Sequence, residues 1–160
     1  MLNIDKSRDT IMSALEERAK ELNCLYRVDE ILGQTDLPDE EIYNRLIRIL
    51  PAGWQFPEIC RTMIAFVDGT RIPADFEPTQ WQQSADIVVM GEKVGEVTAC
   101  YSKEIPRADE GPFLREERRL ISAVAERIGL HIMQQGLRRD HESWETAIRG
   151  LHTSERKPWE

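Results

Sequence analysis

The sequence predicts a single α+β domain in which a small antiparallel sheet is flanked by long N- and C-terminal helices, packed side by side on one of its faces. Apolar residues follow a helical period in the first fifty residues and again after residue 112, and they alternate with other residues in between. The chain has 160 residues, of which 41% are hydrophobic and 31% are charged. That length and composition are typical of one globular domain with its own core.

A long helix is expected from about Ile4 to Leu32, and Gly33 is a natural residue for its end. Its apolar residues recur at intervals of seven, which is close to the period of a coiled coil. These residues are Ile4, Ile11, Leu25 and Leu32, with Leu15 and Leu22 beside them. A shorter second helix begins near Pro38 and ends before the segment 51–53.

The middle of the chain changes to the alternation of strands. A strand is expected over 60–66, followed by a turn at Asp68-Gly69 and a short strand over 70–72. The segment 80–90 contains the β-rich run 87–89, and residues 91–93 connect it tightly to a strand over 94–101. The short connection predicts that these last two strands form an antiparallel hairpin.

A second long helix closes the chain from about residue 113. Its apolar residues occupy one face as far as Gly129, after which Leu130, Met133 and Leu137 fall on the opposite side. The pattern predicts that the helix contacts the sheet first and a partner helix afterwards. Residues 1–139 are thus expected to form the domain, and the polar segment 140–160 a helical tail or linker toward an output domain.

Charge and cysteine usage narrow the possible partners and compartments. The formal net charge of −8 disfavours nucleic-acid binding, which needs a basic surface. The sequence has no apolar run long enough to span a membrane and no signal peptide at its start. The three cysteines are far apart, which suits a reducing compartment. We therefore expect a cytoplasmic protein that binds neither nucleic acid nor a membrane.

Several residue types allow chemistry, and each also has a structural interpretation. Cys60 and Cys100 could face one another on neighbouring strands as a redox sensor, or could be small buried hydrophobes. His131 could ligate a metal or haem, or could pack against neighbouring side chains. The acidic pairs lie on helices and loops beside basic residues, as on solvated helix faces. We therefore predict no catalytic residue and no metal ligand, and the sequence identifies no cofactor.

An aromatic set around the strands gives the candidate ligand pocket. These aromatic side chains could line a cavity between sheet and loop, with an arginine for an anionic ligand, or could form an ordinary core. The candidate residues are Trp54, Phe56, Cys60, Arg61, Phe66, Arg71, Trp81 and Tyr101.

Three segments carry a resemblance to a known family. The segment 50–60 (LPAGWQFPEIC), the segments 110–118 (EGPFLREER) and 125–129 (AERIG), and the segment 22–26 (LNCLY) resemble a divergent group of GAF-like modules. Such modules occur beside sensor histidine kinases and beside domains related to the phosphoenolpyruvate/pyruvate-binding dikinases. The resemblance covers about residues 20–139.

The resemblance implies a GAF/PAS-like sheet and a non-catalytic sensory or regulatory role. Such a module would relay a ligand or partner signal to an output domain such as a histidine kinase. Together with the helix patterns, it predicts a parallel homodimer whose interface is formed by Leu15, Leu22, Leu25, Leu130, Met133 and Leu137. Two alternatives stay open: a purely structural dimerisation module without a ligand, and a small enzyme that uses an acidic pair.

Overall fold

The computed structural model describes the backbone of residues 2–156 and the side chains of residues 6–138, 147 and 148. The chain is an α+β protein, as the sequence predicts. The elements follow in the order α1 (Leu2–Leu32), α2 (Asp39–Ile49), two short 3-10 turns (Leu50–Gly53 and Pro57–Ile59), β1 (Cys60–Phe66), β2 (Arg71–Ile72), β3 (Gln82–Val89), β4 (Glu92–Tyr101) and α3 (Arg115–Arg156).

The four strands form one antiparallel sheet in the order β2-β1-β4-β3. The predicted hairpin is confirmed as β3–β4, but its turn lies one residue earlier than expected. Met90 and Gly91 occupy the turn with φ angles of 52° and 82°. Two positive φ angles match the handed twist of the strands that leave a two-residue turn. In this strand order, β4 is an inner strand that pairs with β1 on one side and with β3 on the other.

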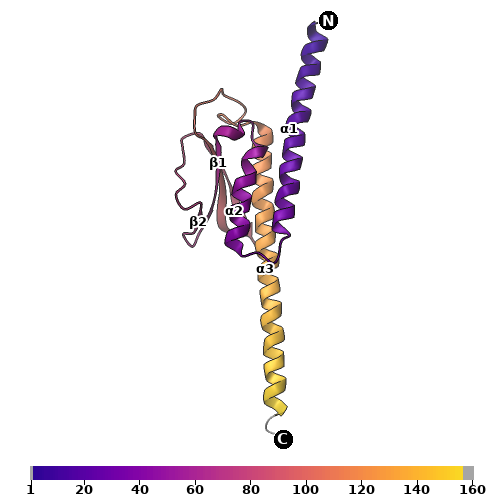
Figure 1. Ribbon diagram of the computed structural model, residues 1–160, viewed down its shortest axis with the longest axis vertical. Coiled ribbons are helices and arrows are strands. Elements are labelled where there is room, and N and C mark those ends of the chain that lie inside the picture. The colour runs from indigo at the N-terminus through magenta and orange to yellow at the C-terminus, as the bar shows by residue number, and fades with distance from the viewer. Residues whose placement is uncertain (1, 157–160) are drawn as a thin grey trace.

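Helices cover one face of this sheet in two layers (Figure 1). Helix α2 packs on β1 and β2, and α3 packs on β3 and β4, whereas α1 lies against α2 and α3. The expectation that the first and last helices lie side by side on the sheet is therefore wrong for α1. Apolar residues of α1 such as Val28 are still fully buried, because they meet the outer side of the α2–α3 layer.

Helices α1 and α3 run in the same direction and are joined by two ion pairs. Arg119 donates two hydrogen bonds of 2.8 Å to the Glu21 carboxylate, and Arg127 Nε lies 3.0 Å from Asp29 Oδ1. Both pairs are 98 residues apart in sequence, so residue n of α1 is level with residue n+98 of α3. The hydrogen bonds from Arg119 lower the pKa of the buried Glu21 carboxyl.

The sheet, α2 and the parts of α1 and α3 that pack on them form the body of the molecule, and the two long helices extend from its opposite ends (Figure 1). In the first half of α1, every side chain from residue 6 to residue 16 is exposed, so this part of the helix packs against none of the described residues. Helix α3 continues across the expected boundary at residue 139 without a break. Apart from residues 147 and 148, the side chains of the expected tail over 140–160 lie outside the described residues. Between residues 2 and 156, no helix is both long enough and apolar enough to cross a bilayer.

Candidate functional site

Most of the aromatic residues expected around a pocket form the core of the domain. Trp54 and Tyr101 are fully buried. The Trp54 indole Nε1 donates to Gln83 Oε1 at 2.9 Å, and the Tyr101 ring stacks on Phe113 with their centroids 5.2 Å apart. Phe56 meets the Tyr101 ring edge-on at 5.9 Å. The structure thus places these side chains, with the half-buried Trp81, in or against the core and not around an open cavity.

A buried carboxylate lies at the centre of this core. Glu117 is 1% exposed, and Tyr101 donates its hydroxyl proton to Glu117 Oε2 at 2.5 Å. The backbone N–H groups of Gln55 and Leu114 donate to the two carboxylate oxygens at 3.0 and 2.7 Å. Burial raises the pKa of Glu117, and these hydrogen bonds oppose the rise. The contact with Leu114 is that of a capping-box glutamate at the start of α3, so Glu117 has a structural role.

The two strand cysteines do not face one another. Cys60 pairs with Tyr101 on the helix-covered face, whereas Cys100 pairs with Arg61 and packs with Met63 on the other face. Alternation along β1 and β4 imposes this separation, so of the two alternatives the cross-strand cysteine pair is wrong, and both cysteines are free and buried. Burial raises the pKa of the Cys60 thiol, which keeps it protonated and unreactive.

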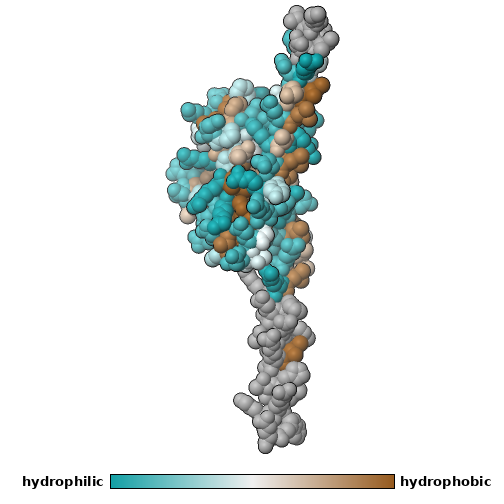
Figure 2. All heavy atoms as spheres, turned by 45° about the vertical axis from the view of Figure 1, so that its right-hand side comes forward, coloured by the Kyte–Doolittle hydropathy of each residue, from teal (hydrophilic) through white to brown (hydrophobic). Residues whose placement is uncertain are grey.

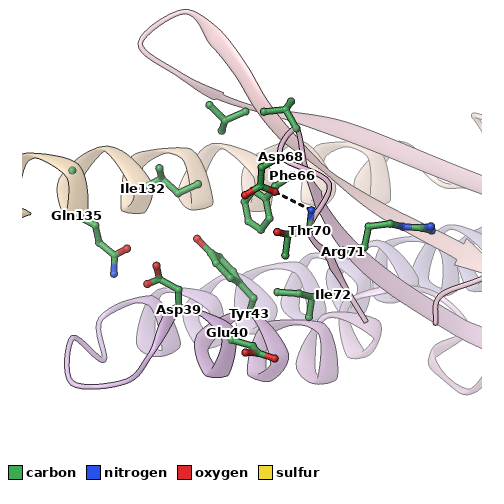
Figure 3. Close-up of a pocket in the computed structure, with 13 residues that line it drawn as sticks. Asp39, Glu40, Tyr43, Phe66, Asp68, Thr70, Arg71, Ile72, Ile132 and Gln135 are labelled. Atoms are coloured by element: carbon green, nitrogen blue, oxygen red, sulfur yellow. Dashed lines mark hydrogen bonds between the residues drawn. The ribbon is translucent and has the colours of Figure 1, made fainter. Parts of the chain in front are cut away.

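An open groove of about 680 Å³ lies between α2, the β1–β2 turn and α3 (Figure 3). Tyr43 and Phe66 form its aromatic floor, with their ring centroids 5.1 Å apart. Ile132 and Gln135 of α3 form the opposite wall. Of the eight predicted pocket residues, only Phe66 and Arg71 line this groove. Sequence analysis missed Tyr43, although it lies on the buried face of the predicted second helix.

The charged groups of the groove are acidic. Asp39 and Glu40 from the first turn of α2, and Asp68 from the β1–β2 turn, lie along its edge. The Arg71 side chain points away from it (Figure 3), because its guanidinium donates to the Phe76 carbonyl at 3.2 Å on the other face of the sheet. Arg71 therefore cannot supply the groove with the positive charge that the sequence suggested.

His131 is buried where α3 passes the end of α1. Its Nε2 has no hydrogen-bond partner among the described residues, and burial lowers its pKa. A neutral histidine in this position packs against its neighbours. Within the described residues, no group of three or more His, Cys, Asp or Glu side chains is placed to hold a metal ion.

An exposed apolar stripe runs along α1 and continues on α3 (Figure 2). On α1, Ile11, Leu15, Leu22 and Tyr26 follow one another at intervals of four, seven and four residues, so they share one face of a straight helix, and Met12 lies beside them. Leu130 is level with the end of α1, so the α3 members extend the stripe beyond it. We define the stripe by its large apolar residues, each at least half exposed: Ile11, Met12, Leu15, Leu22, Tyr26, Leu130 and Leu137.

The stripe includes four of the six residues predicted for the dimer interface. Leu15, Leu22, Leu130 and Leu137 are exposed on it. The prediction that Leu25 belongs to the dimer interface is wrong. Leu25 is buried in the core of the chain, because it lies on the face of α1 that packs on α2 and α3. Met133 is half-buried. Sequence analysis placed Ile11 in the seven-residue seam, but it did not include Ile11, Met12 or Tyr26 in the interface.

Comparison with known proteins found no match: no family model, no curated protein and no solved structure matches the chain. Membership of the GAF family therefore stays a prediction.

Proposed function

We propose that the chain is a non-catalytic regulatory module of the GAF type that forms a parallel homodimer through α1 and α3. The observation that carries the proposal is the stripe of exposed apolar residues on the two helices that extend beyond the body. An apolar stripe of this extent is typical of a protein–protein contact surface. Isolated helical segments of about this length are marginal in water, so the first half of α1 needs a neighbour.

A second copy of the chain fits the stripe better than a strongly charged partner. Between residues 6 and 20, α1 carries four basic and three acidic residues. This nearly balanced segment allows two identical helices to approach without net repulsion, although the whole chain carries −8. By the register of α1 and α3, Leu137 lies 28 residue levels beyond Ile11. The stripe is thus about 40 Å long at 1.5 Å per residue, enough for an extended helical contact.

The groove gives the module a place where binding can alter its helices. Ile132, Gln135 and Gly136 line the groove at the point where α3 leaves the body. A ligand or partner segment in the groove contacts α2, the β1–β2 turn and α3 together. If it prefers one direction of α3, it shifts the population of the dimer toward that arrangement. An output domain attached to α3 would respond to the shift.

The dimer is tested by sedimentation and native mass spectrometry of the purified chain. We expect a mass of two chains for the wild type. The variant Leu22→Asp/Leu137→Asp should be a folded monomer, because it places two charges in the middle of an apolar contact. A control with the same change in charge is Val67→Asp/Met90→Asp, since both residues are exposed in turns outside the stripe.

The control should remain dimeric, and circular dichroism should show native helix content for both variants. A monomeric wild type, or a stripe variant that stays dimeric, would contradict the proposed interface.

The second candidate function is a dimerisation module without a ligand. The observation that favours it is that Trp54 and Tyr101, two of the candidate pocket residues, fill the core. Native mass spectrometry separates the two candidates. A reproducible adduct on the dimer supports a ligand-binding regulator, whereas two bare chains that bind nothing in a ligand screen support the dimerisation module.

A further inference from the structure

A second groove, of about 280 Å³, lies between α1 and α2. Its apolar floor is formed by Ile31 and Ile49, which pack partly against the core. Three arginines, Arg27 from α1 and Arg45 and Arg48 from α2, surround this floor. We call it the arginine groove.

The charge of the arginine groove is opposite to that of the chain as a whole. Its lining contains three guanidinium groups and one carboxylate, that of Glu30. The Glu41 carboxylate also pairs with Arg45, so an excess of one positive charge remains in a protein of net charge −8. The side chains of Arg27 and Arg48 form no hydrogen bond or ion pair with any residue that the structure describes. Bringing like charges together is unfavourable, and an anion between them relieves the repulsion.

Arg45 is already oriented by its neighbours. Its Nε donates to Glu41 Oε1 at 3.1 Å, and its Nη1 donates to Gln34 Oε1 at 3.0 Å. The remaining nitrogen, Nη2, donates to no described residue. A guanidinium fixed in this way loses little conformational entropy when it binds an oxyanion.

We propose that the arginine groove is a binding site for a small phosphomonoester. Guanidinium groups match phosphate oxygens in geometry and form short, charge-assisted hydrogen bonds with them. A phosphomonoester carries a charge of about −1.5 to −2 at neutral pH, which suits a site with an excess of positive charge. The floor of Ile31 and Ile49 contacts the apolar part of the ligand. Such a ligand contacts both α1 and α2. Its contact with α1 includes Arg27, which directly follows Tyr26, the last α1 residue of the stripe.

The site stands apart from the proposed dimer, because one copy of the chain supplies all of its residues. Binding can therefore be measured whether the chain is a monomer or a dimer. A failure of the site leaves the dimer untouched, and a failure of the dimer leaves the site untouched.

The test is titration of the full chain with glycerol 3-phosphate, in which binding is measured by calorimetry and by NMR of the arginine Nε–Hε signals. We expect saturable binding that weakens as salt is added, with shifts at Arg27, Arg45 and Arg48. Glycerol is the neutral control and should not bind. The variant Arg27→Gln/Arg48→Gln should bind at least about tenfold more weakly, since it removes two charged donors.

The matched control is Arg61→Gln/Arg107→Gln, which makes the same change in net charge at two exposed arginines outside the groove. It should bind glycerol 3-phosphate as the wild type does. Arg48→Lys keeps the charge but loses the planar fork, so its affinity should fall between those of the wild type and the double variant.

The proposal is overturned if no saturable binding occurs, if both double variants lose affinity equally, or if the groove variant binds as tightly as the wild type. Binding of a phosphorylated peptide or of anionic lipid vesicles, with neither glycerol 3-phosphate nor inorganic phosphate bound, would also overturn it. That result would assign the arginine groove to a macromolecular partner.

Discussion

At the scale of single residues, Glu117 joins parts of the chain that are distant in sequence. Its carboxylate accepts hydrogen bonds from the start of α3, from the segment before β1 and from the last residue of β4. A buried carboxylate is unfavourable unless its oxygens are well supplied with donors. Here three donors converge on one group, so the site stabilises the fold only while both oxygens accept.

This arrangement predicts that Glu117→Gln destabilises the protein. Both carboxylate oxygens face donors, and a glutamine must turn its own NH₂ group toward at least one of them. We expect a loss of about 1–3 kcal/mol in the free energy of unfolding, measured by urea denaturation at fixed protein concentration. The control Glu126→Gln, on the exposed face of the same helix, should change it by less than about 0.5 kcal/mol. Equal stability of the two variants would contradict this role for Glu117.

The positions of single side chains were only partly predictable from the sequence. Alternation along β1 predicts that Cys60 and Arg61 lie on opposite faces of the sheet, and in the structure Cys60 is buried in the core whereas Arg61 is exposed. Local sequence patterns cannot say whether a side chain meets a cavity or a packed helix, so a pocket and an ordinary core both stayed open for Trp54 and Tyr101, and the structure places both in the core. The contact between Tyr101 and Glu117 spans two elements, and no local pattern encodes it.

At the scale of elements, two glycines of α3 have opposite roles. A Cβ on Gly129 would lie 2.5 Å from the Val88 carbonyl oxygen, where α3 crosses β3 beside a break in its register. A Cβ on Gly136 would meet nothing within 4 Å. The first glycine therefore allows a close approach of helix and strand. Gly136 leaves α3 more flexible beside the groove between α2, the β1–β2 turn and α3, where the helix leaves the body.

The two sites predict opposite effects of the same substitution. Gly129→Ala forces a methyl group against strand backbone and should lower the free energy of unfolding by about 1–3 kcal/mol. Gly136→Ala should raise it by about 0.5–1 kcal/mol, because alanine favours the helix and meets no obstacle. Urea denaturation of the pair measures both changes, with each variant controlling for the other. Destabilisation by both alanines would show that Gly136 also has a packing role.

Element boundaries were largely encoded by local signals, whereas the helix surfaces were not. The limits of α1 and β1, and the β3–β4 hairpin, follow from glycine, proline and periodicity. The seven-residue seam grouped Leu22 with Leu25, yet Leu22 is exposed and Leu25 is buried. Residues three apart lie about 60° from each other around a helix, so packing on α2 and α3 separates them. Both grooves lie between elements, and their shapes depend on packing that periodicity does not specify.

At the scale of the whole molecule, the parallel register of α1 and α3 determines how a dimer can be arranged. If two copies meet along the stripe with a twofold axis parallel to the helices, equal positions face each other along its whole length. In an antiparallel dimer, equal positions meet at one level only. The positions Ala19 on α1 and Gln134 on α3 are both exposed, and they are 17 residue levels apart. That difference corresponds to about 25 Å along the helices.

Spin labels at these two positions therefore distinguish the arrangements. In the parallel dimer, Ala19→Cys and Gln134→Cys should each give a short label–label distance between copies. In an antiparallel dimer, the axial separations of the two pairs must add up to about 50 Å or more, so at least one pair is separated by about 25 Å or more. The native cysteines are buried, and burial raises the pKa of the Cys24 thiol to about 11, so an added exposed cysteine should react selectively. A short distance at one position together with a long distance at the other would contradict the parallel dimer, and with it a relay in which both α3 helices leave the body side by side.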